Sequence, residues 1–308
     1  MVIKTKADER EGSGAKLSIP TINLYCIDSD SVLRAAVVEK IRYACKNRGF
    51  FQVKNGIPVD VLDRMVHGMR EFPEQENGLK KELYSKDAGN KEQYLSSNRF
   101  YKSKKEETGE IRLCVMGLLI HPNPKNYPRF AVLCREIVIE YSKQVKNLGY
   151  TLFELLSEAF GMNPNKLKDM DCAEELSIYG HYYPPFPKQE LTIGTDQHTD
   201  GSFITILLQD KVGGLQVLYE NQWVNVPHME GALVIHAGDL LQASAHNPSY
   251  LVTNDKFISV NHSYSAECRP KSFCGKLFHA RCSARKFKSL WTNQEVVIRR
   301  KSPDIPRS

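Results

Sequence analysis

Short apolar segments separated by turn residues follow one another from about residue 173 onward, and they limit the folds that this chain can adopt. Proline, glycine and aspartate lie between the segments. Many short strands at this spacing favour a double-stranded β-helix, or jelly roll, over an alternating β/α sheet. The predicted strands are Leu176–Tyr183, Phe203–Leu208, Gly214–Tyr219, Gln222–Val226, Ala232–His236 and Lys256–His262.

The N-terminal half shows helical periodicity instead. Ser29, Asp30 and Ser31 offer N-caps for a helix that runs to about residue 48, and apolar residues recur at helical spacing from residue 130 to 161. Between them lie an aromatic strand, Gly49–Val53, and a second helix, Val59–Met69. The sequence therefore predicts an α+β fold with a helical portion at 17–165 and a jelly-roll core at 170–280. Residues 1–16 are expected to be a disordered tail.

The C-terminal segment carries the positive charge of the chain. From Arg269 to Ser308 there are eleven Lys and Arg residues against two acidic ones, so all of the net charge of +6 arises there. Aromatic residues are not interleaved with these charges as in single-strand binding proteins, so no nucleic-acid partner is expected. We predict a poorly packed basic tail at 281–308.

Composition bears on the cellular environment. No stretch approaches 18 apolar residues, and the first 16 residues contain no apolar signal segment, so neither a membrane span nor export is expected. The eight cysteines form no CxxC pair, which is consistent with reduced thiols. The sequence thus predicts a soluble, cytoplasmic monomer that has no membrane partner.

His198 and Asp200 are the first candidate metal ligands. Side chains two residues apart in a strand point to the same face, so an imidazole and a carboxylate would lie together there. Such a pair supplies two of the three ligands of the facial triad that binds non-haem Fe(II). An isolated H-x-D is more often ordinary surface polarity, so a third ligand is required.

Four of the nine histidines compete for the third position. His228 follows a proline in a turn and His246 lies in a polar loop, which favours solvated side chains for both. His236 occurs in an apolar strand and could be a core histidine. His262 ends the alternating segment Lys256–His262, late in the β-core, and we take it as the third ligand.

Several segments carry a resemblance to a known family. They include ELSIYGHYYPPFPKQELTIGTDQHTDGSFITILLQDKVGGLQVLYENQWVNVP, GDLLQ and TNDKFISVNH, with IPTINL, GFFQVKNGIPVDVLDRM and KKELYSKD upstream. Over most of residues 17–262 the chain resembles plant 2-oxoglutarate- and Fe(II)-dependent dioxygenases. It is most similar to the branch called 1-aminocyclopropane-1-carboxylate oxidase homologues.

The resemblance implies both a site and a reaction. His198, Asp200 and His262 fall on the iron ligands, and Tyr183 falls on a tyrosine that contacts 2-oxoglutarate. The implied cofactor is Fe(II), with 2-oxoglutarate and O₂ as co-substrates and ascorbate as a supporting reductant. The implied activity is hydroxylation or a related oxidation of a small plant metabolite, with no catalytic residue beyond the metal site.

The sequence departs from the family after His262. The family has an R-x-S motif there, whose arginine binds the far carboxylate of 2-oxoglutarate. Here Arg269 and Ser272 have two residues between them rather than one. Either Arg269 or Lys271 takes over that role, or the chain is a catalytically impaired copy of the family.

A shift of reading frame offers an explanation for this departure. With permitted codons, Glu267 to Arg307 can be reread one nucleotide out of frame as a family-like ending that contains R-V-S. A shift in the other direction between Glu107 and Tyr127 gives further family-like segments. On this hypothesis the chain after about Cys268 packs poorly and leaves the edge of a neighbouring strand unpaired.

Overall fold

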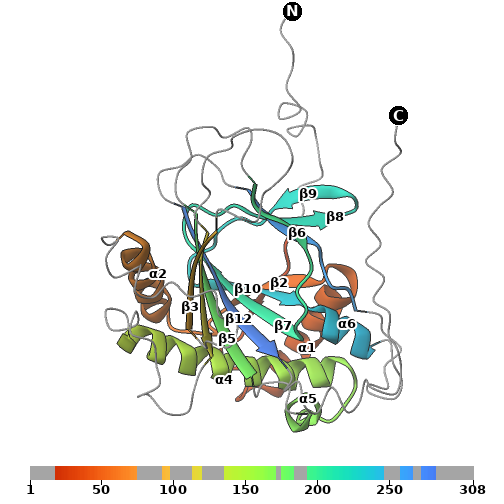
Figure 1. The fold of residues 1–308 in the computed structure, drawn as a ribbon. Coiled ribbons are helices and arrows are strands. Elements are labelled where there is room, and N and C mark those ends of the chain that lie inside the picture. Colours follow the sequence, from red (N-terminus) through yellow and green to blue (C-terminus); the bar gives the residue numbers. More distant parts are fainter. Residues whose placement is uncertain are drawn as a thin grey trace, which may run out of the picture.

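A computed structural model describes residues 18–74, 92–97, 113–119, 135–170, 175–183, 193–245, 257–265 and 272–281 (Figure 1). The expectations for the tails at 1–16 and beyond 281 lie outside these residues. So do those for Arg269, Lys271, His246 and the segment around Glu107. Among the helices described, none is long and apolar enough to cross a lipid bilayer.

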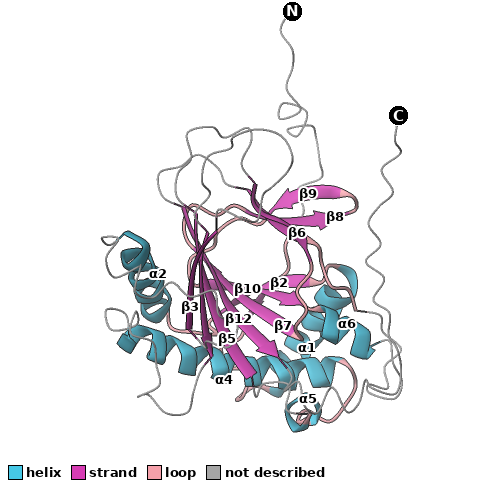
Figure 2. Ribbon diagram, viewed as in Figure 1, coloured by secondary structure: helices cyan, strands magenta, loops and turns pink. Residues whose placement is uncertain are grey.

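Two β-sheets form the centre of the molecule (Figure 2). The larger sheet has the order β1 (Thr21–Asn23), β2 (Phe50–Lys54), β10 (Ala232–Ala237), β7 (Ile204–Gln209), β12 (Ser272–Arg281), β5 (Glu175–Tyr183), β4 (Leu113–Leu119) and β3 (Glu92–Ser97). The smaller sheet has the order β6 (Ile193–His198), β11 (His262–Ser265), β8 (Leu215–Tyr219) and β9 (Gln222–Asn225). The described pairings are antiparallel except that of β1 with β2.

The central strands of the larger sheet are buried on both faces. Every residue of β7 and β10 is buried. Val234 and Leu207 belong to the same apolar cluster as Val217 of the smaller sheet, so this face lies toward the space between the sheets. Ile235 and Ile206 belong to the larger apolar cluster formed with the helices. Because side chains alternate along a strand, His236 shares the face of Val234 and lies between the sheets.

Helices cover the outer face of the larger sheet (Figure 2). They are α1 (Ser31–Asn47), α2 (Val59–Glu74) and α4 (Arg135–Ala159), followed by the short α5 (Lys166–Asp169) and, after β10, α6 (Asp239–Ala245). Asp30 caps α1, since its Oδ1 accepts hydrogen bonds from the amides of Val32 and Leu33 at 2.9 Å each. Nε of Arg34 donates to Glu158 at 2.9 Å and joins α1 to α4.

The predicted α+β jelly roll is confirmed, with some differences in its elements. The structure has strands or helices in the regions predicted for β2, β5, β7, β8, β9, β10, α1, α2 and α4. The strand predicted at Lys256–His262 is wrong, because β11 begins at His262 instead of ending there. The division at residues 165–170 remains a prediction, and β1 to β4 from the N-terminal portion join the same sheet as the core strands.

The expectation of an unpaired strand edge after Cys268 is wrong. Strand β12 pairs with β5 on one side and with β7 on the other, and so fills the middle of the larger sheet. Sheet hydrogen bonds use backbone groups. A segment in which polar and apolar residues do not alternate clearly can therefore still occupy this position. Register shifts between Cys274 and His279 against β5, and between Lys276 and His279 against β7, accommodate the irregularity.

Candidate metal centre

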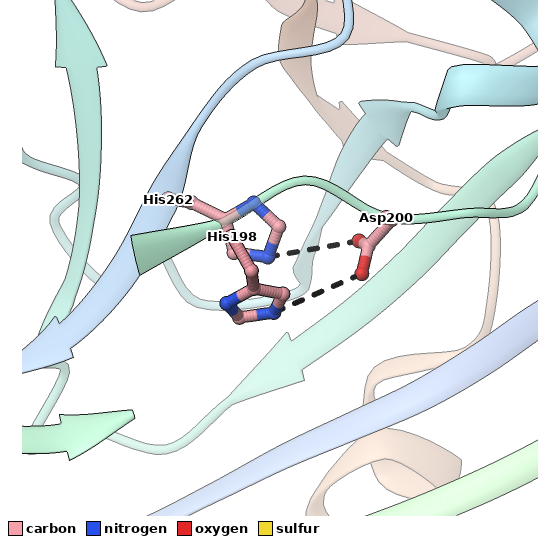
Figure 3. A group of neighbouring side chains, drawn as sticks. All are labelled: His198, Asp200 and His262. Carbon is pink, nitrogen blue, oxygen red and sulfur yellow. Dashed lines mark ion pairs between the residues drawn. The ribbon is translucent and has the colours of Figure 1, made fainter. Parts of the chain in front are cut away.

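The structure brings His198, Asp200 and His262 together at one end of the space between the sheets (Figure 3). One ligand atom from each residue lies within 4.8 Å of the other two. Nε2 of His198 is 4.0 Å from Oδ1 of Asp200, and Nε2 of His262 is 3.6 Å from Oδ2 of Asp200. Among the described residues, this is the one group of three or more potential ligands with such spacing.

Strands β6 and β11 position the two histidines. His198 ends β6, His262 begins β11, and the antiparallel register makes them direct cross-strand partners. Their ring centroids are 4.2 Å apart. Nδ1 of His262 lies 3.2 Å from the carbonyl oxygen of Val260, and a hydrogen bond donated there leaves Nε2 as the lone-pair nitrogen that faces Asp200.

Asp200 reaches the site from a loop, which corrects the sequence-based argument. The prediction placed His198 and Asp200 on one face of a strand, but β6 ends at His198. Backbone contacts with the start of α6 hold the loop instead. The amide of Asp239 donates to the carbonyl of Asp200 at 2.7 Å, and Thr199 Oγ1 donates to Oδ2 of Asp239 at 3.0 Å.

Gly238 allows this close approach. Its amide donates to the carbonyl of Phe203 at 2.9 Å. A Cβ at this position would overlap the carbonyl oxygen of Ser202 and would lie 2.9 Å from that of Asp200. These are backbone atoms, so an added methyl group would have to displace the loop that carries the carboxylate.

We therefore expect Gly238→Ala to lower the free energy of unfolding by about 3 kcal/mol and to weaken metal binding, because overpacking strains a closely packed site. Urea denaturation and titration with Co(II) measure the two effects. Gly201→Ala is the matched control, since nothing lies within 4 Å of the Cβ that it would add. Equal losses in both variants would contradict this interpretation.

The donor set suits a divalent transition metal. Asp200 is 3% exposed and His262 is fully buried, whereas the side chain of His198 is 31% exposed, so a buried charged oxygen faces one buried and one partly exposed imidazole. Distances of 3.6 to 4.0 Å exceed a normal hydrogen bond but leave space for a cation between the donors. Two nitrogens and one carboxylate are the ligands of the facial triad of non-haem Fe(II) enzymes.

His236 also contacts the site, which the sequence argument missed. Its apolar strand predicts a possible core histidine, and the residue is 1% exposed. Its Nδ1 nevertheless lies 3.6 Å from Oδ2 of Asp200, and its ring centroid is 4.4 Å from that of His262. The alternation of side chains along β10 indicates that His236 faces the space between the sheets. It does not indicate that Asp200 lies opposite.

The other candidates lie elsewhere or are described only in part. Nδ1 of His228 is 3.1 Å from the carbonyl oxygen of Gln209, at the end of β7 remote from Asp200. Tyr183 ends β5, where its backbone is in register with Ser272 at the start of β12. The structure thus places the start of β12 beside Tyr183, three residues after Arg269.

Comparison with known families assigns the chain. Residues 175–287 match the family described as the 2OG-Fe(II) oxygenase superfamily, and residues 19–118 match the family described as the non-haem dioxygenase in morphine synthesis N-terminal. A homologue from Arabidopsis thaliana, 1-aminocyclopropane-1-carboxylate oxidase homolog 1, is 48% identical over 84% of this chain and 68% of its own length. The chain belongs to the 2OG-Fe(II) oxygenase superfamily. The resemblance to the 1-aminocyclopropane-1-carboxylate oxidase homologues is confirmed.

Other similar proteins support this assignment. Deacetoxyvindoline 4-hydroxylase from Catharanthus roseus is 49% identical over 80% of this chain, but the match spans only 59% of that enzyme. The structure of JOX2 in complex with 2OG, Fe and JA has a TM-score of 0.72 at 27% identity, and covers 86% of this chain and 75% of JOX2. The structure of the dioxygenase for auxin oxidation in rice has a TM-score of 0.66 at 20% identity over 86% and 84% of the two chains, which supports the fold alone.

Proposed function

We propose that this chain is an Fe(II)- and 2-oxoglutarate-dependent oxygenase that oxidises a small plant metabolite, by hydroxylation or a related reaction. The observation that carries the proposal is the convergence of His198, Asp200 and His262 in a jelly-roll fold. Members of this superfamily use iron and 2-oxoglutarate, and the three donors match the ligand set that such iron sites require. The name of deacetoxyvindoline 4-hydroxylase favours hydroxylation as the outcome.

The residues of the chain would divide the work as follows. His198, Asp200 and His262 would hold the metal through three sites and leave the remaining positions to 2-oxoglutarate and O₂. When bound, iron supplies the oxidising chemistry that side chains lack. Hydrogen bonding to Val260 keeps the His262 ring in the tautomer that can bind a metal. The buried surroundings of Asp200 exclude water from its carboxylate.

Tyr183 and the segment before β12 would bind 2-oxoglutarate. Tyr183 offers one neutral hydroxyl, which is a weak partner for a carboxylate by itself. We propose Arg269 as the cation and Lys271 as its substitute, because the register of Ser272 with Tyr183 brings the chain after Arg269 to the end of β5. Arginine binds a carboxylate through two parallel hydrogen bonds, and lysine provides charge alone.

Succinate formation tests the proposed activity. Purified protein is incubated with Fe(II), ascorbate and 2-oxoglutarate, and succinate is measured with and without a mixture of small plant metabolites. We expect succinate only when iron is present, and more of it when a substrate is oxidised. No iron-dependent succinate from a folded protein that binds Co(II) would contradict the proposed reaction while leaving the metal site intact.

We further propose that the protein works as a monomer in the cytoplasm. A candidate metal site built entirely from residues of one chain supports the monomeric state. Light scattering at micromolar concentration measures the mass, for which we expect one 35.1 kDa chain. A dimer that persists on dilution would contradict this expectation.

A further inference from the structure

The two oxygens of the Asp200 carboxylate have different surroundings. Oδ1 lies 4.0 Å from Nε2 of His198. Oδ2 lies 3.6 Å from two imidazoles, through Nε2 of His262 and Nδ1 of His236. Three histidines therefore face one buried carboxylate, although a facial triad uses only two histidines. The third imidazole needs an explanation of its own.

His236 differs from the other two histidines in its origin. His198 and His262 belong to the smaller sheet, whereas His236 belongs to β10 of the larger sheet. It is paired there with Thr205 of β7 and with Phe50 of β2, and its ring makes an edge contact with that of Phe50 at a centroid distance of 6.3 Å. With strands on both sides, His236 has little freedom to move toward a metal.

The chemistry of a carboxylate ligand indicates what such a histidine can do. A carboxylate that binds a metal through one oxygen keeps the other available as a hydrogen-bond acceptor, and groups that hold metal ligands in this way orient them. The nitrogen of His236 that faces Oδ2 is Nδ1, at 3.6 Å. At 3.6 Å it needs to approach by about 0.6 Å to reach a normal hydrogen-bond distance.

We propose that His236 is a positioning residue for the metal site. Its Nδ1–H donates to Oδ2 of Asp200 and holds the carboxylate so that Oδ1 is presented, beside His198, to the metal. The larger sheet thereby contributes to a metal centre whose two histidine ligands both come from the smaller sheet. The inference rests on metal binding by the triad, which is part of the proposed function, and not on turnover of 2-oxoglutarate.

Three variants of His236 test this role. Asparagine places an amide N–H close to the position of Nδ1, glutamine places its amide close to that of Nε2, and leucine fills similar space without a donor. Purified variants are titrated with Co(II), and the visible absorption of the bound ion gives the dissociation constant. We expect His236→Leu and His236→Gln to bind Co(II) about 10- to 100-fold more weakly, and His236→Asn to stay within about threefold of the unchanged protein.

The outcomes separate positioning from the alternatives. If His236 only filled the core, leucine would maintain both the melting temperature of the metal-free protein and the affinity for Co(II). If His236 were itself a ligand, asparagine would bind Co(II) as weakly as leucine. Either result would overturn the proposal. Should the leucine variant fail to fold, the two amides still decide, because equal affinities of His236→Asn and His236→Gln would exclude a role for the Nδ1 position.

Failure of the metal site itself gives a different result. In that case the unchanged protein would show no saturable binding of Co(II), and His198→Ala would make no difference. If His198→Ala lowers the affinity for Co(II) while every His236 variant keeps it, the proposed function stands and the positioning role of His236 is excluded.

Discussion

His262→Ala is expected to weaken the binding of Co(II) by more than about 100-fold, because removing a ligand should cost more than the 10- to 100-fold typical of residues that only support one. His262 is fully buried, and its Nε2 faces Oδ2 of Asp200 at 3.6 Å. Iron-dependent succinate formation should be lost together with metal binding. Titration with Co(II) and circular dichroism of the metal-free variant measure affinity and folding independently.

His228→Ala is the matched control for this prediction. His228 is partly buried and, like His262, has Nδ1 beside a backbone carbonyl oxygen, but it lies at the far end of β7. Its removal should leave the affinity for Co(II) within about twofold, since surface changes away from a site have small effects. A folded His262 variant that still binds Co(II) as tightly as the His228 variant would exclude His262 as a ligand.

Arg269→Ala is expected to raise the KM for 2-oxoglutarate on the order of 30- to several-thousand-fold. The estimate follows from the loss of one partner of a buried charge pair, which costs about 2–5 kcal/mol. Arg269→Lys should recover little of the loss, because lysine lacks the planar pair of donors. Initial rates of succinate formation over a range of 2-oxoglutarate concentrations measure the effect, and the affinity for Co(II) should not change.

Two comparisons identify the cation. Arg285→Ala removes the same charge farther along the basic segment and should leave KM unchanged. If Lys271→Ala raises KM while Arg269→Ala does not, Lys271 is the residue that binds the carboxylate. If neither Arg269→Ala nor Lys271→Ala changes the KM for 2-oxoglutarate, a cationic partner at these positions is contradicted.

A chain carrying the frame-shifted ending from Glu267 onward tests the frame hypothesis, which predicts a lower KM for the restored R-V-S.

The convergence of the three proposed metal ligands could be predicted from the sequence because their residue types and spacing are distinctive. His198 and Asp200 form an H-x-D, and the resemblance to a family selected His262 among the remaining histidines. Placement on one face of a strand does not explain why they converge, because β6 ends at His198. Asp200 is held by one backbone hydrogen bond, donated by Asp239, and by the close approach of Gly238. Both depend on how a loop meets the start of a helix that is distant in sequence.

Other features depend on tertiary packing and escaped prediction. The sequence shows His236 only as a histidine within an apolar strand. That Asp200 lies beside it follows from how the two sheets face each other. Strand β12 was not expected because polar and apolar residues do not alternate along its sequence. The gap between β5 and β7 requires a strand to satisfy their backbone groups, whatever its side chains are.

The origin of the ligands from different parts of the fold links metal occupancy to the packing of the sheets. His198 and His262 belong to the smaller sheet, while Asp200 is tied through Gly238 and Asp239 to the end of β10 in the larger one. An ion bound by these proposed ligands would connect the two sheets, and its binding free energy would oppose their separation. By reciprocity, a substitution that loosens the apolar cluster containing Val217 and Val234 would lower metal affinity without changing a proposed ligand. Inactive variants of this kind should regain activity at higher iron concentrations.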